Sequence, residues 1–322
     1  MTLEPVHASE HDWKRARSGH LKLVDRELAY LEWGAGAAGD ADGQRTVVLV
    51  HGILSHALVW QPVAELLVER GFRVVAPDLR GHGLSMHNPI GDGYGLISFA
   101  RDLESLLQAL HIERFVLAGH SLGSLVVLFY TACIGTGVEG LALLETLLLG
   151  ASEPVDLQAL LARDLAHMRA THQHQTVPTL QAAANMLRMS HRGLSPELAL
   201  QLCVRGMLET PGGWVWRWDP ILRTRVGLRF PGTRAQYLKI LRQIDVPVQL
   251  LFGRESQFNR SEEKQALTSA FGAVRVASIA GGHNLHIENP GPVADALLSL
   301  VHGVTNCQIG HNRTLDHQWS HT

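Results

Sequence analysis

The sequence has few cysteines, and the three that it has lie far apart. Cys133, Cys203 and Cys307 are odd in number and show no C-x-x-C spacing within the 322 residues. This pattern argues against a disulfide framework and against a cysteine-based zinc site. Histidine is plentiful, with 19 residues, but the pair His172 and His174 lacks carboxylate or cysteine partners at ligand spacing. We therefore expect no metal ion.

Long apolar runs and a surplus of one charge are also missing. No segment offers 18 uninterrupted apolar residues, and residues 1–20 are rich in charged and histidine side chains, unlike a signal peptide. These absences predict a cytoplasmic protein without a membrane span. The formal net charge is −2, and the 28 Lys and Arg residues are scattered. Such a distribution argues against nucleic acid as a partner.

What the sequence does contain is an alternation of strand-like and helix-like segments. Residues 21–24 and 28–33 resemble two early strands that form an antiparallel edge. Further on, short apolar runs alternate with amphipathic stretches, which predicts a parallel sheet with crossover helices. The expected strands are 46–50, 72–76, 114–118, 141–144, 248–252 and 274–279, and the expected helices are 60–71, 97–110, 261–270 and 292–301.

The alternation lapses for about 95 residues. Between residues 151 and 245 the pattern is mostly that of amphipathic helices, at 157–168, 180–189 and 196–207. We interpret this block as an inserted lid. The predicted organisation is an N-terminal arm at 1–20, a core at 21–150 and 241–302, a lid at 151–240 and a C-terminal tail at 303–322, which lacks periodicity.

The segment with the most chemical content is Gly119-His120-Ser121-Leu122-Gly123, between the apolar run 115–118 and a helix-like stretch. A serine at such a turn adopts a strained backbone, and small residues two positions away let strand and helix approach closely. The segment therefore predicts a nucleophile elbow. The Leu122 N–H and the helix N-terminus would face a developing oxyanion.

Two further loops follow neighbouring strands. His51-Gly52-Ile53 ends the strand at 46–50, and the Ile53 N–H is the candidate second oxyanion donor. The loop at 78–85 follows the next strand, and we expect its Asp and Arg residues to fix the turn rather than to take part in chemistry.

A general base is expected near the C-terminus, in Gly281-Gly282-His283-Asn284-Leu285-His286. A serine hydroxyl needs an imidazole to take its proton, and the order serine then histidine fits this need. His283 directly follows the glycine pair, whereas His286 would begin a helical turn. We favour His283 and keep His286 as the competitor.

Taken together, these motifs resemble those of the α/β-hydrolase fold family over about residues 20–302. The matching residues are His51-Gly52, Asp78-x-Arg80-Gly81-x-Gly83-x-Ser85, Gly119-x-Ser121-x-Gly123 and Gly282-His283. The resemblance implies an α/β fold with a mostly parallel eight-stranded sheet, helices on both faces and a helical cap. It also implies a serine mechanism without a cofactor.

The catalytic acid departs from the family's commonest pattern. Family members usually carry an Asp three residues after Gly253, where this chain has Ser256, and Glu255 lies one residue earlier. In a subset, which includes serine hydrolase-like proteins and certain polyketide chain-terminating thioesterases, the acid ends the strand after the elbow helix. Glu145 holds that position. We favour Glu145 and keep Glu255 as the alternative acid.

The expected activity is hydrolysis of a carboxylic ester or thioester with an apolar acyl part. Trp214, Trp216 and Trp218 would share one face of the segment 213–220 if it is extended. They could line an acyl pocket, although packing of the lid against the core is the more common use of such tryptophans. His51, Gly52 and His120 complete the candidate pocket. An acyl carrier is a further candidate partner. A carbon–carbon bond hydrolase and a non-catalytic binding protein on the same fold remain alternatives.

Overall fold

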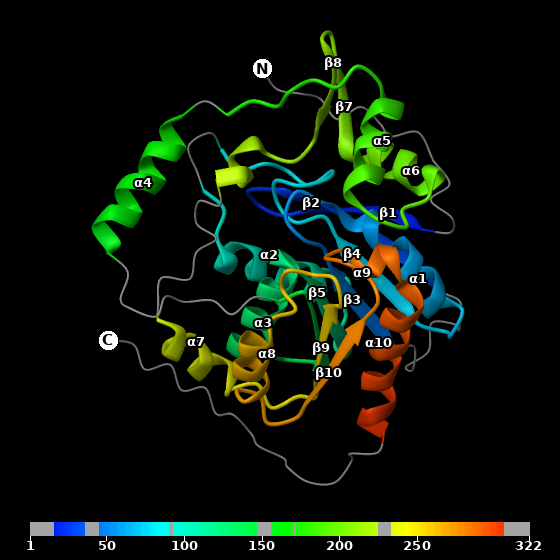
Figure 1. Ribbon diagram of the computed structural model, residues 1–322, viewed down its shortest axis with the longest axis vertical. Coiled ribbons are helices and arrows are strands. Elements are labelled where there is room, and N and C mark those ends of the chain that lie inside the picture. Colours follow the sequence, from blue (N-terminus) through cyan, green and yellow to red (C-terminus); the bar gives the residue numbers. More distant parts are fainter. Residues whose placement is uncertain are drawn as a thin grey trace.

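The computed structural model of the protein describes residues 16–35, 45–89, 93–146, 156–170, 172–224 and 233–305. An eight-stranded sheet with the order β1-β2-β4-β3-β5-β6-β9-β10 runs through its centre (Figure 1). The strands are β1 (Arg17–Lys22), β2 (Glu27–Trp33), β3 (Thr46–Val50), β4 (Arg73–Pro77), β5 (Phe115–His120), β6 (Val138–Leu144), β9 (Val248–Gly253) and β10 (Val274–Ile279). The β1–β2 and β2–β4 pairs are antiparallel, and the other five pairs are parallel. The predicted sheet is thereby confirmed.

The central strands are buried on both faces. Every residue of β3 and β5 is buried, as expected for parallel strands that are covered by helices on both sides. Successive side chains point to opposite faces, so Val47 and Leu49 enter one apolar cluster, whereas Val48 and Val50 enter the other.

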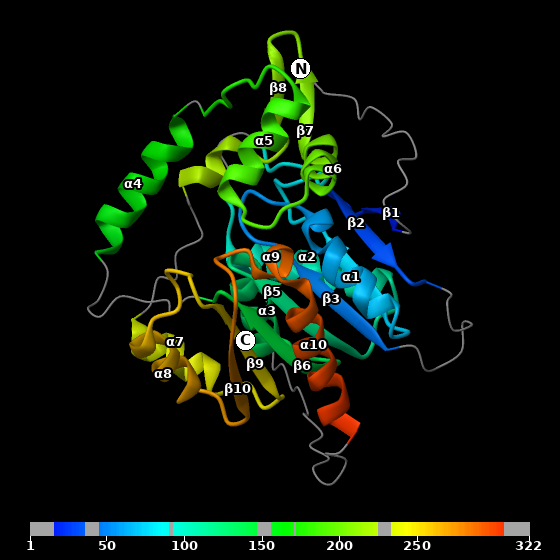
Figure 2. The ribbon, with the colours of Figure 1, turned by 45° about the vertical axis from the view of Figure 1, so that its right-hand side comes forward.

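Helices cover the two faces of the sheet (Figure 2). The first cluster packs under α1 (Gln61–Val68), the short α9 (Leu285–Glu288) and α10 (Pro290–Thr305). The second packs under α2 (Leu96–Ala109), α3 (Leu122–Cys133) and α8 (Ser261–Thr268). Two apolar core layers result, one on each face of the sheet. The loops at the carboxyl edge of the sheet lie next to both layers.

A long insertion separates β6 from β9, at the place where the alternation of the sequence lapses. It consists of α4 (Leu157–Arg169), α5 (Leu180–Ser190), α6 (Pro196–Gly206), a hairpin of β7 (Met207–Thr210) and β8 (Gly213–Trp216), the 3₁₀ turn η2 (Pro220–Thr224) and α7 (Arg234–Leu241). In Figure 1, α5, α6 and the hairpin lie above the sheet, and α4 lies to one side.

The observed elements differ from the predicted ones in four places. The chain leaves α6 at Gly206 and forms a hairpin that the sequence pattern did not predict. Helix α7 packs on α3, where the Tyr237 ring lies 6.0 Å from that of Phe129, although we expected the lid to extend to residue 240. Strand β1 begins at Arg17, inside the expected arm, and α10 continues to Thr305. Residues 1–15 and 306–322 lie outside the described part of the chain.

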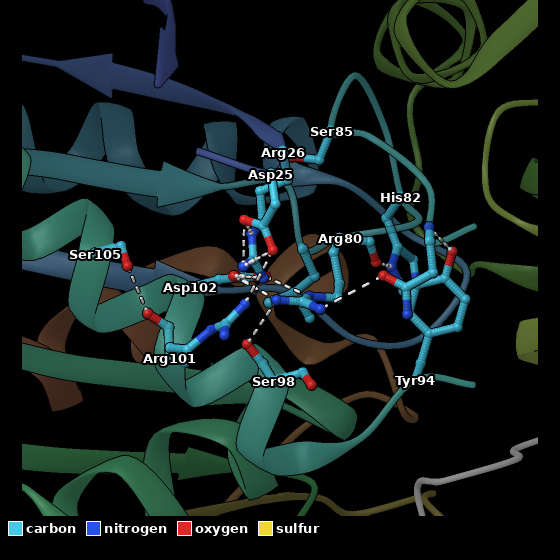
Figure 3. Close-up of polar contacts among 12 residues, drawn as sticks. Asp25, Arg26, Arg80, His82, Ser85, Tyr94, Ser98, Arg101, Asp102 and Ser105 are labelled. Atoms are coloured by element: carbon cyan, nitrogen blue, oxygen red, sulfur yellow. Dashed lines mark hydrogen bonds and ion pairs between the residues drawn. The ribbon is translucent and has the colours of Figure 1, made fainter. Parts of the chain in front are cut away.

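The loop after β4 is fixed by buried ion pairs (Figure 3). Arg80 donates from Nε and Nη2 to the two carboxylate oxygens of Asp102 on α2, at 2.5 and 2.6 Å. Arg26 adds a hydrogen bond of 3.1 Å to the same carboxylate. This bidentate pair holds the loop rigidly, in agreement with the structural role expected for Arg80.

Candidate active site

Ser121 occupies a strained turn between β5 and α3. Its φ is 51° and its ψ is −113°, a conformation that non-glycine residues seldom adopt. Despite this backbone, the Ser121 N–H remains bonded to the Leu144 carbonyl of β6 at 2.9 Å. A Cβ atom on Gly119 would lie 2.3 Å from the Gly123 oxygen, and one on Gly123 would lie 2.2 Å from the Val50 oxygen. The two glycines are therefore required by close backbone approach.

Two backbone amides flank Ser121. Leu122 is the first residue of α3, so its N–H belongs to the first turn, whose donors have no partner within the helix. The loop that carries Ile53 approaches from β3, since a Cβ atom on Gly52 would lie 3.3 Å from the Ser121 Cβ. Both predicted oxyanion donors thus lie on segments that adjoin the serine.

The loop after β10 brings His283 to Glu145. His283 Nδ1 lies 3.0 Å from Glu145 Oε2, and because a carboxylate only accepts, the imidazole donates. The neutral ring then carries its lone pair on Nε2. The Glu145 side chain is fully buried, whereas that of His283 is one-third exposed. Glu145 itself has a φ of 53°, and its N–H bonds to the Leu251 carbonyl at 2.9 Å.

The alternative base and the alternative acid, His286 and Glu255, do not take part in this contact. Glu255 is exposed and accepts from the Gly281 N–H at 2.6 Å. His286 is buried in α9, with its ring 4.6 Å from that of Trp60. Burial lowers the pKa of His286 to about 3, so its ring is neutral. Of the two histidines and two glutamates weighed from the sequence, the structure brings His283 and Glu145 into contact.

Glu145 receives two further hydrogen bonds from the turn after β9. The Gly253 N–H donates to Oε1 at 2.6 Å, and the Ser256 hydroxyl donates to Oε2. We did not identify Ser256 as a site residue from the sequence. The available signal was its position three residues after Gly253, where family members commonly carry the acid.

A cavity of about 280 Å³ opens beside Ser121, between the insertion and the carboxyl edge of the sheet. The core contributes residues from its loops, among them Gly52, Ile53, His120, Ser121 and His283. The insertion contributes mainly apolar side chains and one histidine, namely Leu187, His191, Leu194, Leu202, Trp216 and Trp218. Two of the three tryptophans of the segment 213–220, Trp216 and Trp218, thus line the cavity.

Four predicted pocket residues, Gly52, His120, Trp216 and Trp218, line this cavity, and two do not. His51 is buried behind it, where Nδ1 donates to the Gly52 oxygen at 2.7 Å and Nε2 accepts from the Leu79 N–H at 2.9 Å. Burial lowers its pKa to about 4, so this neutral ring fixes the loop. Trp214 instead pairs through its backbone with Val177.

His120 connects the elbow to the histidine loop. Its Nε2 lies 2.8 Å from the carbonyl oxygen of His283, so Nε2 donates. The two rings are 4.7 Å apart. Burial lowers the pKa of His120 well below its ordinary value, which keeps the ring neutral. This contact ties the backbone of the two loops together.

The described residues lack two further features. They contain no group of three or more His, Cys, Asp or Glu side chains arranged to hold a metal ion. Within the same ranges, no helix combines the length and the apolar character that a bilayer crossing requires. The cytoplasmic location stays a prediction.

Comparison with known proteins decides the family. Residues 45–290 match the family model described as alpha/beta hydrolase fold, which is well over half of the chain. The chain belongs to the α/β-hydrolase fold family. The family resemblance seen in the sequence is thereby confirmed.

Several α/β hydrolases are similar over most of the chain. A serine hydrolase-like protein from Danio rerio is 26% identical, with coverage of 80% of this chain and 81% of the relative. Serine hydrolase-like protein 2 from Homo sapiens is 27% identical, with coverage of 87% and 94%. Among solved structures, a thioesterase domain from the curacin biosynthetic pathway has a TM-score of 0.81 and 32% identity, over 88% of this chain and 99% of that domain. This α/β hydrolase is therefore similar to serine hydrolase-like proteins and to a thioesterase domain.

Proposed function

We propose that this α/β hydrolase cleaves a carboxylic ester or thioester through an acyl-enzyme. Ser121 is the nucleophile, His283 the general base and Glu145 the acid that orients it. The observation that carries this proposal is the 3.0 Å contact between His283 Nδ1 and Glu145 Oε2, on loops that adjoin the strained Ser121 turn.

The proposed steps follow from the tautomer of His283. Because Nδ1 donates to Glu145, Nε2 is free to take the proton of the Ser121 hydroxyl as its oxygen attacks the substrate carbonyl carbon. The Ile53 and Leu122 N–H groups stabilise the oxyanion. Collapse of the intermediate expels the alcohol or thiol, which takes the proton from His283. Water then attacks the acyl group through the same base and releases the carboxylic acid.

The character of the cavity supports an uncharged, apolar acyl group. Leucine, isoleucine, valine and tryptophan side chains predominate, and no Lys, Arg, Asp or Glu is among the described residues that line it. An anionic acyl chain would lose its hydration there without gaining a counter-charge. The similar thioesterase domain favours an acyl thioester, with an acyl carrier as its donor.

Labelling with a fluorophosphonate tests the nucleophile. Ser121→Ala serves as the control, and peptide mass spectrometry locates the adduct. We expect an adduct on Ser121 alone, followed by turnover in a panel of acyl esters and thioesters. A folded protein that remains unlabelled and hydrolyses none of these compounds would contradict the proposal and favour a binding protein on this fold.

A matched pair of variants tests the acid. Glu145→Gln removes the carboxylate that contacts His283 Nδ1, whereas Glu255→Gln alters a side chain that contacts Gly281. We expect Glu145→Gln to lower the labelling rate by about 10³- to 10⁴-fold, because the wrong tautomer is then favoured. Glu255→Gln should leave it within about threefold, since an exposed contact contributes little. A reversed order would assign the acid to Glu255.

A further inference from the structure

The turn after β9 contains a serine whose hydroxyl contacts the acid of the proposed site. Ser256 donates to Glu145 Oε2, the same oxygen that accepts from His283 Nδ1. The Ser256 oxygen also accepts from the Phe258 N–H at 3.1 Å. A serine hydroxyl donates one hydrogen bond and can accept two, so the single donor of Ser256 is committed to Glu145 and one of its lone pairs to Phe258.

The first of these bonds helps to compensate a buried charge. Glu145 is fully buried, and the described residues offer it no Lys or Arg in hydrogen-bond or ion-pair contact. Its carboxylate is held by three donors, namely the Gly253 N–H, the Ser256 hydroxyl and the His283 ring. A buried anion without a counter-ion depends on such donors. Removal of the Ser256 hydroxyl leaves Oε2 bonded to His283 alone.

The second bond connects Ser256 to the histidine through an aromatic ring. Phe258 places its ring 4.7 Å from the His283 ring, and its backbone is tied to Ser256. Ser256 therefore reaches His283 by two routes, through the carboxylate at Nδ1 and through the aromatic ring. The backbone at this point is tight as well, because a Cβ atom on Gly253 would lie 2.2 Å from the Gly282 oxygen.

We propose that Ser256 is a positioning residue, whose hydroxyl fixes the Glu145 carboxylate and the Phe258 ring so that His283 faces Ser121 in the reactive orientation. The inference rests on the proposed function, since it assigns Ser256 a part in the same reaction. Ser256 does not line the cavity. Its loss should therefore slow the chemical step and leave binding in the cavity unchanged.

The test compares fluorophosphonate labelling of Ser121 in the whole chain and in four variants. Ser256→Ala deletes the hydroxyl, and Ser256→Thr retains it. Ser256→Val has the shape of the threonine variant without its hydroxyl, and serves if the alanine variant fails to fold. Ser269→Ala is the matched control, because Ser269 is exposed and its hydroxyl donates to a backbone carbonyl of α8, that of Ala266. Saturation kinetics give the maximal labelling rate and the apparent binding constant separately, and thermal melting checks that each variant is folded.

We expect Ser256→Ala and Ser256→Val to lower the maximal labelling rate about tenfold, the effect of losing one hydrogen bond to a charged group. The binding constant should stay within about twofold, and Ser256→Thr should restore most of the rate. Ser269→Ala should match the parent protein. Equal maximal rates for the threonine and valine variants would overturn the inference, as would a loss confined to the binding constant.

A proton spectrum separates this inference from the proposed function. The His283 Nδ1–H shared with Glu145 should give a far-downfield resonance in the parent that shifts or disappears in Ser256→Ala and persists in Ser269→Ala. Suppose that the resonance is present in the parent and changes only in Ser256→Ala, but Ser121 is not labelled. The positioning contact then stands and the catalytic proposal fails. If labelling proceeds and the resonance is the same in all variants, Ser256 plays no positioning part.

Discussion

The insertion is joined to the core by a buried ion pair that can be tested by unfolding. Arg205 of α6 donates from Nη2 to Asp78 Oδ2 at 2.8 Å, and the two side chains are 1% and 0% exposed. Asp78 also accepts from the Ala57 and Leu84 N–H groups, at 2.7 and 2.9 Å. Burial alone would raise the pKa of Asp78, but Arg205 beside it brings the pKa below its ordinary value.

Removal of one partner should be costly and removal of both should not. Arg205→Met leaves the Asp78 carboxylate buried with two backbone donors, and breaking such a pair costs about 3–5 kcal/mol of unfolding free energy. The double variant Arg205→Met with Asp78→Asn removes both charges of this pair. Since the Arg205 Nε finds no hydrogen-bond partner among the described residues, the native pair is incompletely compensated. We expect the double variant to recover at least half of the loss.

Urea unfolding with linear extrapolation measures these differences. Arg114→Met is the matched control, because Arg114 pairs with Glu139 at the surface, with its own side chain 72% exposed. Such a pair contributes less than about 1 kcal/mol. If Arg205→Met is no more destabilising than Arg114→Met, the pair does not hold the insertion to the core, and the reasoning from burial is wrong.

Three further predictions concern packing, the cavity and pH. Gly123→Ala should abolish soluble folded protein, because its Cβ would lie 2.2 Å from the Val50 oxygen; circular dichroism of the purified variant checks this, and a native spectrum would refute it. Trp216→Ala should change the acyl-chain preference of ester hydrolysis and Trp214→Ala should not, since only Trp216 lines the cavity; equal effects on a chain-length series would contradict the assignment. Burial lowers the pKa of His51 from 6.5 to about 4 in the folded protein. As the pH falls, His51 is therefore protonated in the unfolded chain before it is protonated in the folded one. Stability should be complete above about pH 6.5 and decline towards pH 4, by roughly 3 kcal/mol for this histidine, as measured by urea unfolding across that range.

The sheet was predictable because its rules are local. Apolar runs of four to six residues, separated by amphipathic stretches, predict a parallel sheet with crossover helices, and five of the seven strand pairs in the eight-stranded sheet are parallel. The insertion was recognised from the lapse of this alternation. Its hairpin was missed because β7 is only four residues long and continues directly from α6. Helix α7 was assigned to the lid because a sequence pattern does not reveal which neighbour a helix packs against.

In the candidate site, too, some residues could be predicted from the sequence and others could not. Ser121 and His283 were identified from short motifs, since each depends on glycines within two residues along the chain. The choice of acid was not local. Glu145 and Glu255 are both carboxylates near strand ends, and only the packing of the His283 loop against β6 and β9 shows which one contacts the imidazole.

The sequence by itself thus determined the order of strands and helices, the place of the insertion and the strained serine turn, because these depend on periodicity and backbone conformation over a few residues. Only the tertiary structure decided that one carboxylate oxygen of Glu145 accepts both from His283 and from Ser256, which is 111 positions away from Glu145. It also decided that Trp216 faces the cavity and Trp214 does not. The physical reason is that hydrogen bonds and cavities form between side chains brought together by the sheet, and their distances are not encoded in local spacing.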